Sequence, residues 1–96
     1  MPFPQQDGRT FTRAAIEALN PGQIGCYGLY VAHGHWVYVG RGDIRSRLLD
    51  HLNGDNACIV RQKPTHFLTV VTRNDEAEEK ALIAELNPSC NKTAGG

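Results

Sequence analysis

The sequence has no excess of either charge, since its ten Lys and Arg residues balance ten Asp and Glu residues and the formal net charge is zero. It therefore lacks the strongly basic field that would by itself indicate a nucleic-acid-binding protein. No run approaches the roughly 20 apolar residues that span a membrane. The start of the chain also lacks the basic segment and apolar stretch of a secretory signal. We therefore expect a cytoplasmic protein that does not enter a membrane.

Cysteine is scarce and is not arranged in pairs. The three residues Cys26, Cys58 and Cys90 are widely spaced, and no Cys-x-x-Cys motif occurs. An odd, scattered set of this kind predicts neither a disulfide framework nor a zinc site, and the four histidines complete no standard zinc spacing with it. We expect free thiols, buried or partly buried, in a reducing compartment.

What the chain does contain is the balance of one small globular domain, with 96 residues, 41% of them hydrophobic and 21% charged. The pattern of apolar and turn residues predicts an α/β (α+β) fold, with a central three-stranded, largely antiparallel sheet flanked by helices. We expect an arm over residues 1–9, one domain over residues 10–92 and a flexible tail over residues 93–96. The expected elements are a helix over 10–20, hairpin strands over 24–32 and 36–39, a helix over 43–52, a strand over 66–72 and a helix from 74 or 75 to 87.

One acidic residue of the last expected helix lies in an unusual place. At about 100° per residue, Leu82, Ile83 and Leu86 fall within roughly 60° of the direction of Glu79. Burying an unpaired carboxylate costs several kcal/mol, so Glu79 needs a metal ion, a proton or a cation such as Arg45 or Arg47. Because Mg²⁺ is often held by one carboxylate and several waters, we expect a metal ligand or a catalytic acid, with a structural ion pair as the alternative.

The helix expected over residues 43–52 carries Arg47 and His51, which are four residues apart and border one side of its apolar stripe. Taken alone, Arg47 is typical of a solvated helix surface, and His51 of a partly buried histidine that is hydrogen-bonded to the backbone. Their shared face makes both candidates for a site at the edge of the sheet.

The hairpin carries Tyr30 and Tyr38 on adjacent strands, and we expect both hydroxyls on one face. Gly28 and Gly40 are less ordinary, because glycine weakens a strand unless something must approach the backbone closely. Gly40 also precedes a helix N-terminus, where backbone N–H groups favour a phosphate.

Taken in chain order, these residues resemble the motif set of the GIY-YIG nuclease superfamily. Its first signature is matched by Gly28-Leu29-Tyr30 and its second by Tyr38-Val39-Gly40. The resemblance covers residues 25–92. Its single motif residues are matched by Arg41, Arg47, His51, Glu79 and Asn91.

The resemblance implies an endonuclease that hydrolyses a DNA phosphodiester with one divalent ion, Mg²⁺ or Mn²⁺. In this interpretation Glu79 holds the metal, and Arg47 neutralises charge on the phosphoryl group. A tyrosine hydroxyl, of Tyr38 or Tyr30, accepts a proton from the attacking water, and His51 relays it. The expected substrate- and phosphate-binding residues are Gly40, Arg41, Arg45 and Asn91.

The expected partner is DNA, branched or as non-specific duplex, in repair or recombination. Because members of the superfamily usually gain specificity from extra domains, we expect a protein partner, a homodimer or low specificity to fill that role here. The alternative is a non-catalytic module on the same fold that binds nucleic acid or protein. The zero net charge favours the alternative, whereas the presence of both Arg47 and Glu79 favours the nuclease.

Overall fold

The structure is a computed structural model, and it describes residue 3 and residues 6–91. The elements are β1 (Arg9–Thr10), α1 (Arg13–Glu17), β2 (Ile24–Val31), β3 (His35–Asp43), α2 (Ile44–Leu52), α3 (Ala57–Gln62), β4 (His66–Val71) and α4 (Asp75–Leu86). The expectation of a small α+β domain with an antiparallel sheet is confirmed. None of the described helices is long and apolar enough to cross a lipid bilayer.

The sheet has four strands in the order β1-β4-β2-β3, with every neighbouring pair antiparallel. The expected three strands are β2, β3 and β4. The fourth, β1, was missed because it comprises only Arg9 and Thr10, which pair with Phe67 and His66 at the edge of the sheet. Two residues are too few to show the alternation of apolar and polar side chains that predicts a strand.

The hairpin is longer than its glycines suggested. We expected the second strand to end at Val39, but β3 continues through Gly40 and Gly42 to Asp43. Gly40 pairs with Tyr27 of β2, and a Cβ atom at Gly40 would collide with the Tyr27 hydroxyl. Glycine is therefore required in the strand because the ring of its partner residue lies across it.

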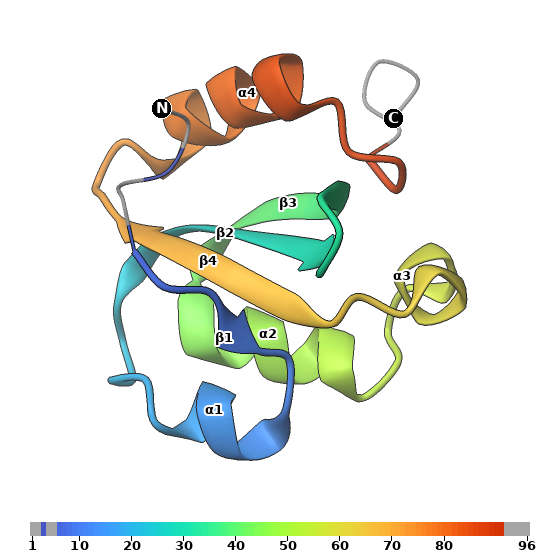
Figure 1. Cartoon of the computed structure of the whole chain (residues 1–96). Coiled ribbons are helices and arrows are strands. Elements are labelled where there is room, and N and C mark those ends of the chain that lie inside the picture. Colours follow the sequence, from blue (N-terminus) through green and yellow to red (C-terminus); the bar gives the residue numbers. More distant parts are fainter. Residues whose placement is uncertain (1–2, 4–5, 92–96) are drawn as a thin grey trace.

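Helices cover both faces of the sheet, so that the domain has three layers (Figure 1). On one face α4 covers a small core that includes Cys26, Val39 and Leu82. On the other face α1 and α2 cover the larger core, which includes Ile16, Tyr27 and Leu48. Since successive side chains of a strand point to opposite faces, odd and even positions of β2 belong to different cores.

Side chains cap three of the helices and fix where they begin. Thr12 accepts a hydrogen bond from Ala15 N, so α1 is shorter than the helix expected over residues 10–20. Asp43 caps α2, as expected, by accepting from Ser46 N at 3.2 Å. Asn56 caps α3, where we had expected a loop with a short helical turn, by accepting from Cys58 N and Ile59 N.

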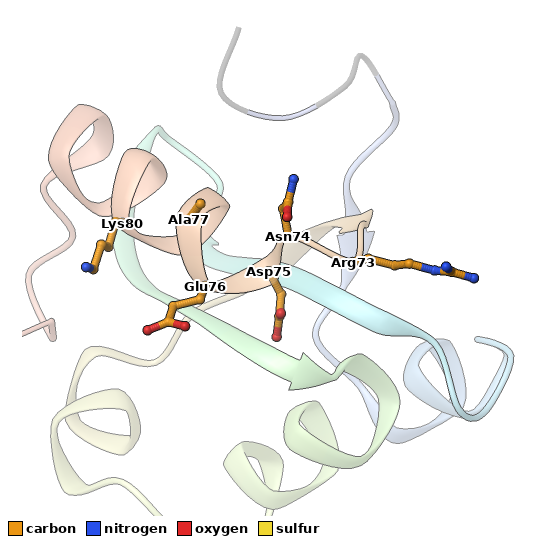
Figure 2. Close-up of a pocket in the computed structure, with 6 residues that line it drawn as sticks. All are labelled: Arg73, Asn74, Asp75, Glu76, Ala77 and Lys80. Carbon is orange, nitrogen blue, oxygen red and sulfur yellow. The ribbon is translucent and has the colours of Figure 1, made fainter.

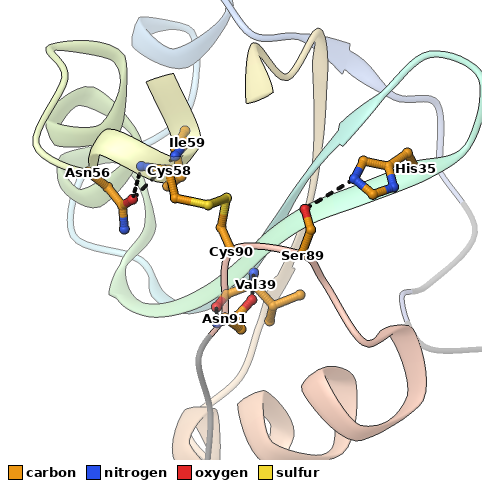
Figure 3. The surroundings of a disulfide bond; sticks show 8 residues. All are labelled: His35, Val39, Asn56, Cys58, Ile59, Ser89, Cys90 and Asn91. Carbon is orange, nitrogen blue, oxygen red and sulfur yellow. Dashed lines mark hydrogen bonds between the residues drawn. A yellow bond between two sulfur atoms is a disulfide. The ribbon is translucent and has the colours of Figure 1, made fainter. Parts of the chain in front are cut away.

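The expectation of three free thiols is wrong for two of them, because Cys58 and Cys90 form a disulfide with a Cα–Cα distance of 5.7 Å (Figure 3). Spacing along the chain did not reveal the pair, since 32 positions separate the two residues and only the fold brings α3 to the segment after α4. Cys26 is free and buried, as expected. The disulfide removes the argument for a reducing compartment, because such bonds persist in oxidising ones.

The described part of the expected N-terminal arm is bound to the domain. Phe3 is buried and stacks on Trp36 with ring centroids 5.7 Å apart. Gln6 uses both ends of its amide on Thr69, donating to its carbonyl oxygen at 2.7 Å and accepting from its N–H at 3.1 Å. The expected tail over residues 93–96 lies outside the described residues.

Candidate active site

A chain of three side chains stands at the centre of the candidate site. The Tyr27 hydroxyl lies 2.6 Å from His51 Nε2, and His51 Nδ1 lies 2.8 Å from Asp55 Oδ1. Tyr27 and His51 are buried, with relative exposures of 1% and 3%, whereas Asp55 is exposed. The hairpin supplies the tyrosine, the last turn of α2 supplies the histidine, and the loop before α3 supplies the carboxylate.

Tyr38 lies beside this chain as expected, and it is half-buried. Its ring centroid is 5.1 Å from that of His51, with the rings edge to face, and 6.3 Å from that of Tyr27. Tyr38 and Tyr27 share a face because β3 pairs Tyr38 with Leu29, which is two positions from Tyr27.

Arg47 brings a positive charge to the same cluster. Its side chain is about half exposed, and Nη1 pairs with Asp50 Oδ2 at 3.4 Å. Exposed ion pairs of this kind contribute little to stability. The guanidinium is therefore free to exchange Asp50 for another anion at low cost.

The pKa values of the two phenols follow from burial and from these neighbours. Burial raises the pKa of Tyr27, and the Tyr38 phenol raises it further, while Arg47 lowers it through its charge and a hydrogen bond. Burial and then the Glu79 carboxylate raise the pKa of Tyr38, and Arg47 again lowers it. The cation that promotes phenolate formation is thus Arg47.

Tyr30 is not part of this cluster, and the expectation that its hydroxyl shares a face with that of Tyr38 is wrong. Tyr30 packs against Trp36 and His66, with ring centroids 5.1 and 5.5 Å away. Trp36 belongs to the core beneath α4, so Tyr30 faces that layer and not α2. Tyr30 is three residues from Tyr27, and an odd separation in a strand reverses the face.

Glu79 lies on the α4 side of the sheet and already has a cationic partner. Its Oε1 is 3.4 Å from Arg41 Nε, and Arg41 Nη1 is 3.4 Å from Asp75 Oδ2. The Glu79 side chain is 24% exposed, so it is at the border of the apolar face and not at its centre. The structural ion pair, which was the alternative to a metal ligand and was considered with Arg45 or Arg47, is made instead by Arg41, because Arg41 is the strand residue on this face.

The Glu79 carboxylate is only partly compensated by this ion pair. Burial raises its pKa, Arg41 lowers it, and Asp75 raises it again. A second positive charge would therefore stabilise the ionised form. Among the described residues no group of three or more His, Cys, Asp or Glu side chains is placed to hold a metal. Because Mg²⁺ is often held by one carboxylate together with waters and substrate phosphate, Glu79 is the described residue that could hold such an ion.

Asn91, the last motif residue, fixes the strand that carries Tyr38 and Gly40. Its side-chain amide accepts from Val39 N at 2.8 Å and donates to Val39 O at 2.9 Å (Figure 3). Asn91 follows Cys90, so the disulfide connects this amide to α3. This supports an orienting role for Asn91, and contact with a phosphate is not needed to explain its position.

The other expected phosphate-binding residues are divided between the two faces. Gly40 lies against the Tyr27 hydroxyl, and Arg41 lies with the acids of α4. Arg45 is on α2, partly buried, and its Nε has no hydrogen-bond partner among the described residues. The structure therefore does not gather these residues into one phosphate site.

A hollow lies at the N-terminus of α4, next to the ion pairs of Arg41. Figure 2 shows that the side chains of Arg73 and Lys80 point away from each other, with Asp75 and Glu76 between them. The remaining lining residues are Asn74 and Ala77. Because the two cations diverge and the acids occupy the space between them, the hollow has no convergent set of groups for an anion.

Two members of the central chain, Tyr27 and Asp55, were missed at the level of sequence. Gly25-Cys26-Tyr27 has the same Gly-x-Tyr form as Gly28-Leu29-Tyr30, and the register of the hairpin decides between them. A register shift between Leu29 and Tyr30 makes Leu29 the partner of Tyr38, which puts Tyr27 on the face of Tyr38. Asp55 comes after the helix, where periodicity gives no direction.

The chain matches no family model, and no curated protein matches it. Its function is therefore inferred from its own residues and their geometry.

Proposed function

We propose that the protein is a divalent-metal-dependent endonuclease of the GIY-YIG type that hydrolyses DNA phosphodiester bonds. The observation that carries the proposal is the buried contact of 2.6 Å between the Tyr27 hydroxyl and His51 Nε2, with Arg47 against the same hydroxyl. A phenol with a proton acceptor and a cation beside it has the parts of a general base.

The geometry favours Gly25-Cys26-Tyr27 as the first signature in place of Gly28-Leu29-Tyr30. Tyr27 and Tyr38 flank His51, whereas Tyr30 faces the other layer. With this assignment the two tyrosines, the arginine and the histidine lie in one cluster. The role that we expected for Tyr30 passes to Tyr27.

In the proposed reaction Arg47 leaves Asp50 for the scissile phosphate. Its guanidinium matches a phosphate through two parallel hydrogen bonds and opposes the charge that develops there. The Tyr27 hydroxyl, with the Arg47 charge beside it, takes a proton from the attacking water as its own proton goes to His51 Nε2. The water oxygen bonds to phosphorus, and the 3′ oxygen leaves with the electron pair of the broken bond and is protonated by solvent.

Glu79 is the residue proposed to hold Mg²⁺ or Mn²⁺, which when bound polarises the phosphate and stabilises the leaving oxygen. The Glu79 carboxylate also raises the pKa of Tyr38, so its charge acts on that phenol from the α4 side of the sheet, which supports this proposal. Arg41 favours the ionised form of the carboxylate, against the burial that raises its pKa, and pairs with it at 3.4 Å.

The experiment is a cleavage panel of linear duplex, flap, branched and single-stranded DNA, with and without Mg²⁺, for the native protein and Glu79→Ala. We expect metal-dependent cutting by the native protein and none by Glu79→Ala, whose fold is checked by its thermal unfolding. Glu85→Ala, an exposed acid on the same helix, is the matched control and should cut normally. Undiminished cutting by Glu79→Ala would remove the proposed metal ligand.

A non-catalytic nucleic-acid-binding module is the second candidate, and the Arg41–Glu79 ion pair favours it because it gives the acid a structural role. This candidate predicts DNA binding that weakens steeply with salt and no cutting of any substrate in the panel. The same binding should be unchanged in Glu79→Ala.

A further inference from the structure

The tautomer of His51 is determined by the acid beyond it. A carboxylate only accepts hydrogen bonds, so the 2.8 Å contact with Asp55 Oδ1 requires a proton on His51 Nδ1. In the neutral ring Nε2 is then an acceptor. The Tyr27 hydroxyl, 2.6 Å away, must therefore be the donor in the contact with Nε2.

We propose that Asp55 is a positioning residue for catalysis, which holds His51 in the tautomer that receives the Tyr27 proton and stabilises the imidazolium that results. This inference rests on the proposed function, in which Tyr27 gives up that proton. The proton leaves the phenol oxygen, arrives on Nε2, and makes the ring a cation with both nitrogens protonated. The charge then faces the Asp55 carboxylate through Nδ1.

The surroundings of His51 leave no other anion for this role among the described residues. The groups that face its ring are Tyr27 from β2 and Tyr38 from β3, both neutral phenols. Arg47, one turn earlier on α2, adds positive charge to the cluster. Burying an unpaired imidazolium is unfavourable, so the Asp55 carboxylate is the group that stabilises the protonated His51 ring.

Asp55 is itself held in place by the loop between α2 and α3. Its backbone N–H donates to Asp50 O at 3.3 Å, and the next residue, Asn56, caps α3. Two residues further on, Cys58 is bonded to Cys90. The carboxylate thus stands on a short segment fixed at both ends, as expected of a group that orients another.

The test combines ¹⁵N NMR of the histidine side chains with the pH dependence of cleavage, in the native protein and in Asp55→Asn. His51 is assigned by the signals that vanish in His51→Gln. We expect the native His51 to carry its proton on Nδ1. In Asp55→Asn we expect a larger share of the Nε2-protonated form, a rate lower by about 10- to 100-fold, and a shifted pH–rate profile.

Matched controls separate positioning from folding. Glu85→Gln makes the same change of charge on the opposite layer and should leave the His51 signals and the pH profile unchanged. Tyr27→Phe keeps the acid but removes the phenol, and its His51 should retain the proton on Nδ1. Native-like unfolding curves for Asp55→Asn and Tyr27→Phe show that both variants fold.

The two readouts also separate this inference from the proposed function. A native His51 with its proton on Nε2 would overturn the role of Asp55 whether or not DNA is cut. So would Asp55→Asn with native tautomer and native pH profile. If the native protein cuts no DNA while the NMR result is as expected, the nuclease proposal and the catalytic part of the inference fail, and Asp55 only sets the tautomer.

Discussion

The two faces of the sheet each carry a tyrosine beside a histidine, and in both pairs the ring centroids are 5.5 Å apart. One pair is Tyr27 with His51, and the other is Tyr30 with His66. In the first pair the hydroxyl is hydrogen-bonded to the imidazole, and the other ring nitrogen is hydrogen-bonded to a carboxylate. In the second pair the imidazole bonds to the hydroxyl of its neighbour, Thr65.

The difference teaches that closeness of rings does not distinguish a site from a packing contact. What distinguishes the first pair is an unbroken route for a proton from a buried phenol to an exposed acid, with a guanidinium alongside. The second pair is partly exposed and has aromatic neighbours in place of charged ones. Only the first pair has the groups that general base catalysis requires.

The largest expected effect comes from removing one hydroxyl from each pair. Tyr27→Phe should lower the rate of DNA cleavage by about 10³-fold, since it removes the proposed base. Tyr30→Phe, its matched control, should change the rate by less than about twofold. Initial rates on the best substrate of the panel test this. Equal losses in the two variants would place Tyr30 in the site and break the comparison.

The next effect concerns the disulfide, which connects α3, directly after the loop that carries Asp55, to the segment after α4. Loss of the Cys58–Cys90 bond should lower the free energy of unfolding by about 3 to 4 kcal/mol, from the loop-closure entropy for its separation of 32 positions. Denaturant unfolding with and without a reductant measures this. The double variant Cys58→Ser, Cys90→Ser should be as unstable as the reduced protein and insensitive to reductant.

Hydrogen exchange sharpens the same test. On reduction, amides around His51 and Asp55 should exchange faster, while those around Tyr30 and His66 should change little. Loss of protection that is equal at both pairs would show that the bond stabilises the whole domain and has no special connection with the site.

A smaller effect is expected from Asn91→Ala, which removes both hydrogen bonds to Val39. The backbone groups left without partners should cost about 1 to 3 kcal/mol. The variant should also cut DNA more slowly, since Val39 lies between Tyr38 and Gly40. Thermal unfolding and cleavage rates measure the two effects, with Ser89→Ala as a control nearby. Native values for both would remove the orienting role.

The smallest effect is a dependence of stability on alkaline pH. The folded pKa of Tyr27 is raised, so the folded state holds its proton after the unfolded phenol, with a pKa near 10, has lost it. Tyr27 therefore stabilises the fold fully below about pH 10 and less as the pH rises. For one such group the loss is about 1.4 kcal/mol by pH 11, and Tyr27→Phe should lose that much less than the native protein.

Sequence patterns predicted the order of the long elements because each has an apolar period and an end signal. The cap at Asp43 and the strand from His66 are examples. The sequence patterns also placed Tyr38, Arg47 and His51 in one site. Three features escaped prediction: the register of β2 against β3, which selects Tyr27 over Tyr30, the loop position of Asp55, and the disulfide. Only the disulfide depends on how distant segments meet. The hairpin register includes a shift between Leu29 and Tyr30, and Asp55 lies beyond the end of a helix, so apolar periodicity carries no information about either.

The segment after α4 has one further consequence for how the protein behaves in solution. This segment forms hydrogen bonds along the outer edge of β3. Ser89 N–H donates to Trp36 O, Cys90 N–H donates to Val37 O, and the Asn91 side-chain amide bonds to the backbone N–H and carbonyl of Val39. An uncovered outer strand is a template on which other chains add. Because the Cys58–Cys90 bond holds this segment, reduced protein should self-associate more readily than oxidised protein. The segment would then protect the strand edge from aggregation.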